Sequence, residues 1–250
     1  MTETRTLMGM TITVEIADTS ASKDILDEVF AFFEYVDATF STYKDTSEIT
    51  RINKKELRPA DYGEDMKTVL ALSEQTKKET NGYFDIIAPD GTYDPSGLVK
   101  GWAIYRAAQL LEQRGMKHFY VNAGGDIQTR GKNNAGEKWS VGIKNPFNTK
   151  EIVKTVFLQN EGVATSGTYL RGQHIWNPKK RSEALTEIVS ITVIGPNVYE
   201  ADRFATAAFA MGKDGIGFIE KLSGFEGYQI DKNGMATMTS GFEEYTNAHA

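Results

Sequence analysis

The order of helices and strands along this chain constrains its fold more than any other feature of the sequence. Apolar residues recur at helical spacing in three early stretches, residues 25–40, 63–80 and 98–114. Short runs rich in β-branched and aromatic residues then follow between Gly and Asn turns, at 119–121, 127–129, 139–143, 153–158 and 163–164. Because helices and strands are grouped and do not alternate as βαβ units, the sequence predicts an α+β fold.

Strands are also expected outside this central run. Residues Met10 to Ile16 alternate apolar and polar side chains, as a half-buried strand does. Residues 188–194 are apolar enough for a strand inside the sheet. A hairpin is predicted near the end of the chain, with strands at 228–230 and 235–238 and a turn at Asn233-Gly234. The 250 residues are compatible with one large domain or two small ones.

The composition excludes several classes of function. The chain has no cysteine, which rules out disulfides, thiolate zinc sites and cysteine nucleophiles. Its net charge of −6 argues against nucleic acid or an anionic membrane as the main partner. No apolar run approaches the roughly 20 residues of a membrane helix, and the first residues lack the apolar core of a signal peptide. We therefore expect a cytoplasmic protein without a membrane span.

The segment Glu200 to Gly212 contains the first candidate site. Its Ala, Phe and Met residues favour a helix, and Gly212 stands where a left-handed C-terminal cap belongs. On that helix Asp202 and Thr206 project from one face, one turn apart. A carboxylate and a hydroxyl presented together suit Mg²⁺ or Ca²⁺. Alternatively, Asp202 caps the helix and Thr206 bonds a carbonyl one turn back.

A second candidate site lies at the start of the third predicted helix. Ser96 and Gly97 precede this helix, so free backbone N–H groups and the positive end of the helix dipole face any ligand there. Lys100 on the first turn adds a positive charge, and the combination predicts an anion or phosphate site. The spacing is not that of a P-loop. The simpler alternative is a turn glycine and a solvated lysine.

Two further segments are rich in glycine, hydroxyl groups and ionisable side chains. Asn122 to Asp126 follows a predicted strand, and its paired glycines permit the close approach of a ligand. A tight turn in which Asp126 bonds its own backbone would have the same sequence. In the stretch 163–178, Arg171 could hold a phosphate and His174 could move a proton near neutral pH. The common alternative for a lone histidine is a half-buried structural role.

Taken in order, these segments resemble the sequence pattern of the ApbE family, the FAD:protein FMN transferases. The resemblance covers Leu7 to Phe242. The matching blocks are Met8-Gly9-Met10, Ser41 to Asn53, Gly82 to Asp85, Gly97 to Gly101, Asn122 to Asp126, Thr165 to Arg171, His174 to Pro178 and Ala201 to Ala207. Each block alone is weak, but so many blocks in the family's order make the resemblance specific.

The resemblance implies a fold and a reaction. The fold is a single domain over residues 1–250, in which early helices pack with a mainly antiparallel central sheet and an active-site cleft lies between two lobes. The reaction is the Mg²⁺-dependent transfer of FMN from FAD to a Thr or Ser hydroxyl of an acceptor protein, with release of AMP. Two alternatives remain open, an FAD pyrophosphatase that gives FMN and AMP, and a non-catalytic FAD-binding protein.

The resemblance also implies roles for individual residues. Asp202, Thr206 and the backbone carbonyl of Gly97 would bind Mg²⁺. His174 would be the base that takes the acceptor's proton, with Asp202 or Asp126 the less favoured choice. The residues implied to contact FAD are Ser41, Tyr43, Asp85, Gly97, Lys100, Asn122, Gly124, Gly125, Asp126, Thr165, Ser166, Gly167, Tyr169 and Arg171.

The chain departs from the family pattern in several places without losing a proposed metal ligand. Ser96 replaces a glycine, and Thr168 and Asn177 each stand where the family commonly has Asp. The connection from Asp85 to Asp94 is also short. Substrate preference and the identity of the base therefore stay open at the level of the sequence.

Overall fold

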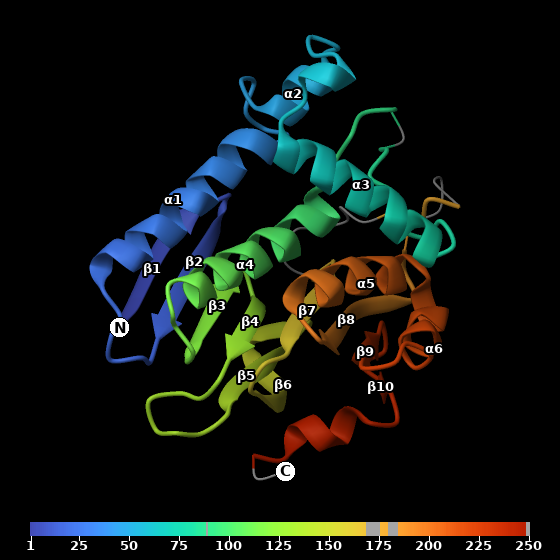
Figure 1. Cartoon of the computed structure of the whole chain (residues 1–250). Helices are drawn as coiled ribbons and strands as arrows, with labels where there is room; N and C mark the ends of the chain where they lie inside the picture. The colour runs from blue at the N-terminus through green and yellow to red at the C-terminus, as the bar shows by residue number, and fades with distance from the viewer. Residues whose placement is uncertain (89, 169–175, 180–184, 249–250) are drawn as a thin grey trace.

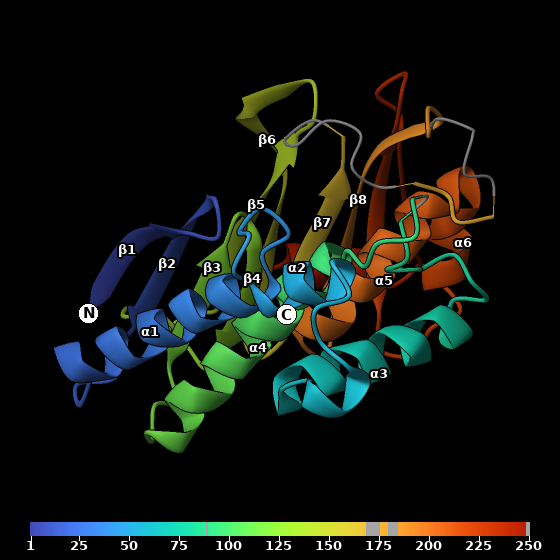
Figure 2. The ribbon, with the colours of Figure 1, turned by 90° about the horizontal axis from the view of Figure 1, so that it is seen from above.

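An eight-stranded antiparallel sheet runs through the molecule, with strand order β1-β2-β3-β4-β7-β8-β9-β10. Helices cover one of its faces, and a separate two-stranded hairpin, β5–β6, lies on the other (Figures 1 and 2). The structure is a computed structural model, and it describes residues 1–88, 90–168, 176–179 and 185–248. The α+β class predicted from the sequence is confirmed.

The elements follow the predicted order closely. The strands are β1 Thr2–Leu7, β2 Met10–Ile16, β3 Phe119–Ala123, β4 Asp126–Arg130, β5 Trp139–Asn145, β6 Asn148–Leu158, β7 Gly162–Gly167, β8 Ile188–Gly195, β9 Glu226–Asp231 and β10 Ala236–Met238. The α-helices are α1 Lys23–Phe40, α2 Glu48–Asn53, α3 Glu64–Glu79, α4 Ser96–Gln113, α5 Val198–Ala210 and α6 Gly215–Ile219, and the short 3₁₀ helices are η1 Pro59–Asp61, η2 Gly212–Asp214 and η3 Phe242–Thr246. The predicted strand at 188–194 lies inside the sheet, between β7 and β9, as expected.

The sequence pattern does not predict β1. Its residues, Thr2 to Leu7, alternate between exposed and half-buried positions and place no fully buried row on either face. The strand exists because it pairs with β2 across a turn at Met8-Gly9, where φ is positive at both residues, 53° and 70°. Positive φ at both central positions is the geometry of the type I′ turn that hairpins favour. Pairing with a neighbour, which side-chain periodicity does not reveal, therefore creates this edge strand.

Two hydrophobic clusters fill the space between the sheet and its helices. The first joins α1, α2, α3 and α4 to β2 and β3, and Phe30, Phe33 and Phe119 are among its fully buried members. The second joins α5 and α6 to β7 and β8 and includes Phe209 and Ile191. Helices α4 and α5 pack against each other where these clusters meet. Because α5 also contributes Val198, Tyr199 and Ala207 to the first cluster, it joins the two halves of the helical layer.

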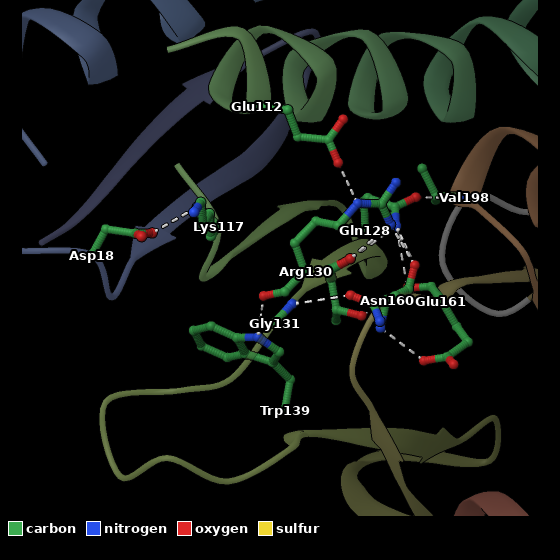
Figure 3. A network of polar contacts seen from close by, with 11 residues as sticks. Asp18, Glu112, Lys117, Gln128, Arg130, Gly131, Trp139, Asn160, Glu161 and Val198 are labelled. Carbon is green, nitrogen blue, oxygen red and sulfur yellow. Dashed lines mark hydrogen bonds and ion pairs between the residues drawn. The ribbon is translucent and has the colours of Figure 1, made fainter. Parts of the chain in front are cut away.

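The β5–β6 hairpin is held on the opposite face of the sheet. A third hydrophobic cluster fills this side, formed by Ile127, Ile143, Val156, Leu158, Val163, Ile194, Tyr228, Ile230 and Phe242. At the base of the hairpin, the Arg130 carbonyl accepts a 3.0 Å hydrogen bond from Nε1 of Trp139, and the Arg130 side chain binds Glu112 of α4 and the Asn160 carbonyl (Figure 3). The hairpin is therefore anchored to the sheet at its first residue.

Gln128 of β4 fixes the position at which α5 begins. Its Oε1 accepts a 2.8 Å hydrogen bond from the Val198 N–H, while its Nε2 donates to carbonyls of the β6–β7 connection (Figure 3). Gly162 lies on the other side, where a Cβ atom would be 1.9 Å from the Val198 nitrogen, so only glycine fits. Asp202 and Thr206 follow one and two turns further along α5, and these contacts therefore position them.

Candidate functional site

Helices α4 and α5 approach closely where the two proposed ligand-binding segments lie. Gly97 and Gly101 of α4 face Thr206 and Asp202 of α5. The Thr206 hydroxyl donates a 3.1 Å hydrogen bond to the Gly97 carbonyl, and the Gly101 N–H donates a 2.8 Å bond to Asp202 Oδ2. A Cβ atom at Gly101 would lie 2.6 Å from the Asp202 Cβ, so this approach requires glycine. Two glycines one helical turn apart thus bring a carboxylate, a hydroxyl and a carbonyl together.

The Asp202 side chain does not cap helix α5, and the Thr206 hydroxyl bonds to α4 and not to the preceding turn of its own helix. The N-cap of α5 is Asn197, whose side chain accepts a 3.0 Å hydrogen bond from the Glu200 N–H. Asp202 lies inside the helix and is only 3% exposed, and the Thr206 hydroxyl bonds across to α4. The alternative in which Asp202 caps the helix and Thr206 bonds one turn back is therefore wrong. The predicted left-handed residue after the helix is confirmed, because Gly212 has φ +66°.

Lys100 lies between two buried carboxylates. Its Nζ is 2.5 Å from Asp126 Oδ2 and 3.7 Å from Asp202 Oδ1. The other oxygen of Asp126 accepts a 3.0 Å hydrogen bond from the Thr165 N–H of β7. The exposed fractions of the Lys100 and Asp126 side chains are 17% and 2%. The alternatives of a solvated lysine and of an aspartate that bonds its own turn are therefore wrong, and the ion pair links α4 to β4 and β7.

These groups open into one pocket of about 870 Å³, a volume that includes the solvent at its mouth. The lining residues are Tyr83, Phe84, Asp85, Ile86, Asp94, Ser96, Gly97, Lys100, Gly124, Thr165, Ser166, Gly167, Trp176, Pro178, Asp202 and Thr206. Ser96 and Gly97 begin α4, and the positive end of its dipole favours an anion. The Trp176 Nε1 is buried and has no hydrogen-bond partner among the described residues. A donor of this kind fits a ligand that supplies an acceptor.

Comparison with known protein families shows to which family this chain belongs. The sequence model of the ApbE family matches residues 8–92 and 87–228 of the chain. The chain belongs to the ApbE family. The matched residues include the start of α4, the β7 strand and the Asp202 helix, so the family match spans the pocket described above. The resemblance inferred from the ordered sequence blocks is confirmed.

Relatives within the ApbE family carry the name FAD:protein FMN transferase. The protein of that name from Haemophilus influenzae is 26% identical, in an alignment that covers 93% of this chain and 87% of that protein. The one from Escherichia coli K12 is 31% identical, in an alignment that covers 58% of this chain and 44% of that protein.

Solved structures of the ApbE family share the fold. The flavin transferase ApbE from Vibrio cholerae superposes with a TM-score of 0.85 at 21% identity, over 98% of each chain. The ApbE protein from Thermotoga maritima superposes with a TM-score of 0.86 at 18% identity, over 99% of each chain. The arrangement of helices around the sheet is therefore that of the family.

The donor groups in this ApbE-family pocket fit a magnesium ion shared with phosphates. Asp202, Thr206 and Gly97 offer a carboxylate, a hydroxyl and a carbonyl oxygen, which are all hard ligands. Within the described part of the chain, no group of three or more His, Cys, Asp or Glu residues could hold a metal. Mg²⁺ commonly binds through one or two carboxylates together with waters and substrate phosphates. One carboxylate beside a lysine therefore suits Mg²⁺ on a phosphate better than a metal cage of protein ligands.

The structure brings together most of the residues implied to contact FAD. The pocket is lined by Asp85, Gly97, Lys100, Gly124, Thr165, Ser166 and Gly167, and Asp126 contacts Lys100. Asp85 is itself held by a 3.0 Å ion pair with Lys77 at the end of α3. Tyr169, Arg171 and His174 lie outside the described residues, and their roles stay predictions.

Other residues implied to contact FAD do not line this pocket. Ser41 and Tyr43 lie on the α1–α2 connection, where the Ser41 carbonyl accepts a 2.6 Å hydrogen bond from the Ser47 hydroxyl and Tyr43 is 98% exposed. Asn122 and Gly125 line a second groove on the face of the sheet that carries the β5–β6 hairpin. Asn122 Oδ1 accepts a 3.0 Å bond from the Gly125 N–H there. Their contact with FAD stays a prediction.

Several residues that line the pocket are absent from the residues that the resemblance implies to contact FAD or Mg²⁺, although the sequence places Ser96 at a predicted anion site. They are Tyr83, Phe84, Ile86, Asp94, Ser96, Trp176 and Pro178. The sequence could have indicated two of them, because Tyr83 and Phe84 immediately precede Asp85 in one of the family's sequence blocks. The Lys179 ammonium lies 4.3 Å from the centre of the Tyr83 ring and connects this block to the Trp176–Lys179 segment. Only the folded chain shows that these segments meet.

Proposed function

We propose that this chain transfers FMN from FAD to a Thr or Ser hydroxyl of an acceptor protein, in a Mg²⁺-dependent reaction that releases AMP. One observation carries the proposal, namely that the oxygens of Asp202, Thr206 and Gly97 lie in one pocket with Lys100 and the start of α4. Metal-binding oxygens beside anion-binding groups are what a pyrophosphate requires. The names of the family members support flavin as the transferred group.

The charged groups of the pocket would bind the pyrophosphate of FAD. Asp202, Thr206 and the Gly97 carbonyl would hold Mg²⁺, which would neutralise the charge that develops on the phosphate oxygens. Lys100, held in place by Asp126, would supply a second positive charge. The first turn of α4 would orient the phosphates through its N–H groups and dipole.

The remaining residues of the pocket would position the reacting atoms. Thr165 and Ser166 reach the pocket from β7, and the rings of Tyr83, Phe84 and Trp176 offer apolar surface for the planar rings of FAD. The acceptor oxygen forms a bond to the FMN phosphorus, the bond from that phosphorus to the AMP oxygen breaks, and AMP leaves with the electron pair. The acceptor's proton passes to a base. Alignment of hydroxyl, phosphorus and leaving group supplies a large share of the rate.

His174 is the proposed base. Both oxygens of Asp126 are already engaged, one by Lys100 and the other by a backbone N–H. Asp202 accepts the Gly101 N–H and faces Lys100. In each aspartate one oxygen accepts a backbone hydrogen bond and the other faces the Lys100 ammonium, which favours the charged form over one that has taken a proton from a substrate hydroxyl. This supports His174 over the two aspartates, as the sequence pattern does.

The first test is the intact mass of a flavinylatable acceptor domain after incubation with this protein, FAD and Mg²⁺, with EDTA as the control. We expect a Mg²⁺-dependent gain of one FMN, and no gain when the target Thr of the acceptor is changed to Ala. If AMP and FMN appear in solution without a gain in acceptor mass, the protein is an FAD pyrophosphatase. FAD that binds tightly without any release of AMP would indicate a non-catalytic FAD-binding protein.

The location of the protein is less constrained than its reaction. Among the residues that the structure describes, no helix combines the length and the apolar character needed to cross a bilayer. A cytoplasmic location and a single domain over residues 1–250 stay predictions.

A further inference from the structure

Strand β5 has one free edge. It pairs with β6 in a two-stranded sheet, and no other strand of the described residues pairs with it. A groove of about 1190 Å³, including the solvent at its mouth, lies beside it. The consecutive residues Trp139, Ser140, Val141 and Gly142 all line this groove, although successive side chains of a strand point to opposite faces. The groove therefore follows the backbone edge of β5 and not one of its faces.

The other wall of this β5 groove is the face of the main sheet opposite the helices α1 to α6. The wall residues come in pairs from three adjacent strands, Thr11 and Thr13 of β2, Tyr120 and Asn122 of β3, and Ile127 and Thr129 of β4. Hydroxyl, amide and ring groups of this kind suit the mixed polar and apolar surface of a polypeptide. Among the described residues that line the groove, Lys144 is the single charged one.

The groove is rigid at its base. Trp139 is fixed by the 3.0 Å hydrogen bond from its Nε1 to the Arg130 carbonyl, and its ring stands at 67° to that of Tyr120 with 5.1 Å between the ring centres. Arg130 is held in turn by Glu112 and the Asn160 carbonyl (Figure 3). The angle between β5 and the main sheet is therefore fixed before any partner binds, which lowers the entropic cost of binding.

The β5 groove continues into the proposed active pocket. Gly124 lines both of them, and Gly125 lines the groove at the same turn. Their φ angles are +63° and +104°, which favour glycine. The Met10 side chain packs against Gly124, with its Sδ 3.1 Å from the Cβ position there, whereas no atom lies within 4 Å of the Cβ position at Gly125. An extended chain in the groove can therefore reach the pocket across Gly125.

We propose that the β5 groove binds an extended segment of the acceptor protein as an added strand on the free β5 edge. The Thr or Ser hydroxyl of that segment then enters the pocket past Gly125. This inference rests on the proposed function, because it is that function which makes the second substrate a polypeptide. A free strand edge offers N–H and C=O groups at the spacing of another strand, and alternate side chains of the guest then meet the sheet wall.

Two substitutions that place a long side chain in the groove test this inference. Thr11→Arg and Ser140→Arg both lie at exposed groove positions outside the FAD pocket, on opposite walls. Thr2→Arg is the matched control, because Thr2 is exposed on β1 and does not line the groove. We expect both groove variants to raise the KM for a flavinylatable acceptor domain at least about tenfold, which corresponds to about 1.4 kcal/mol of binding. The KM for FAD and the kcat should stay within about twofold of wild type.

Hydrogen exchange supplies a readout that does not depend on FMN transfer. Binding of the acceptor domain should slow exchange of amides within residues 139–145, because an added strand pairs with the free edge of β5.

The outcomes of the two experiments distinguish this inference from its alternatives. An unchanged acceptor KM in both groove variants, or β5 amides that the acceptor domain does not protect from exchange, overturns the inference. If the groove variants instead raise the KM for FAD, the groove binds part of the FAD molecule and not the acceptor. If the wild type transfers no FMN at all, the proposed function fails, and exchange alone then decides whether the domain binds here.

Discussion

At the scale of single residues, Asp202 combines a structural contact with a proposed chemical one. One of its oxygens accepts the N–H of Gly101, and the other faces Lys100 at 3.7 Å. The residue is only 3% exposed and its bond to the Gly101 N–H is buried, so loss of the acceptor leaves a buried donor without its partner. A substitution that removes the charge therefore differs from one that also removes the hydrogen-bond acceptor.

Comparison of Asp202→Asn with Asp202→Ala separates these two contributions. Both variants should lose Mg²⁺-dependent transfer, because neither supplies a carboxylate ligand. Asp202→Ala should lose about 1–3 kcal/mol more free energy of unfolding than Asp202→Asn, since the buried Gly101 N–H is left unpaired. Urea unfolding without metal or FAD measures this difference. Equal stabilities of the two variants would show that the bond to Gly101 contributes nothing.

At the scale of elements, the α4–α5 pair determines the geometry of the pocket. The two helices meet through Gly97 and Gly101 on one side and Thr206 and Asp202 on the other. Each pair is spaced by one helical turn, so the contact repeats along the helix axes. Any side chain at the glycine positions separates the helices and moves the oxygens that would bind the metal.

Gly101→Ala should lower both stability and activity. The new Cβ would lie 2.6 Å from the Asp202 Cβ and 2.8 Å from the Val198 carbonyl oxygen, so α5 must shift, at a cost of about 1–3 kcal/mol. Displacing ligands by about 1 Å can lower the rate roughly 100-fold. The control is Gly217→Ala in α6, where no atom lies within 4 Å of the added Cβ. Denaturant unfolding should show the control to be unchanged or up to about 1 kcal/mol more stable.

The sequence predicts helices and strands correctly where apolar residues recur at the spacing of a buried helix or strand face, or where the whole segment is apolar. The strand at Met10–Ile16 and the helices α1, α3 and α4 each bury one side, and each is confirmed. The strand at Ile188–Gly195 and helix α5 are also confirmed, but they are buried on nearly all sides and were predicted from their apolar composition. The first strand escapes prediction because its formation depends on pairing with β2 and not on a buried face of its own. Periodicity likewise indicates that Asp202 and Thr206 share a face, but it cannot show which helix they meet.

At the scale of the whole molecule, Arg203 ties α3 to α5 and thus connects the outer helix to the helices at the pocket. Its side chain is 5% exposed, and its guanidinium binds Glu79 of α3 and also lies 2.5 Å from Glu200. Burial acts to raise the pKa of Glu79, but hydrogen bonds from Gln75 and Arg203 and the charge of Arg203 outweigh it, so the pKa lies below its ordinary value. The ionised carboxylate therefore stabilises the folded chain.

This pairing predicts how the stability of the molecule depends on pH. Because the folded-state pKa of Glu79 is lowered, its contribution is present above the ordinary value of 4.5 and is lost as the pH falls through the folded-state value. Glu79→Gln should therefore be less stable than wild type at pH 7, and the difference should shrink at pH values below 4.5. Unfolding curves across this range measure it. Glu74→Gln, an exposed position on the same helix, should match wild type throughout, and a constant deficit for Glu79→Gln would exclude the charge as its cause.

The sequence by itself determined the order and type of most elements, the ApbE-family blocks and the shared helix face of Asp202 and Thr206. These features depend on residues close to one another in the chain, where spacing alone sets which side chains lie together. Only the tertiary structure decided that Asp202 meets Gly101, 101 residues away, and that Lys100 is buried against Asp126. It likewise decided that one edge of β5 pairs with no other strand of the described residues and lies beside the groove that adjoins the pocket. Such contacts depend on how distant segments pack, and local periodicity carries no information about that packing.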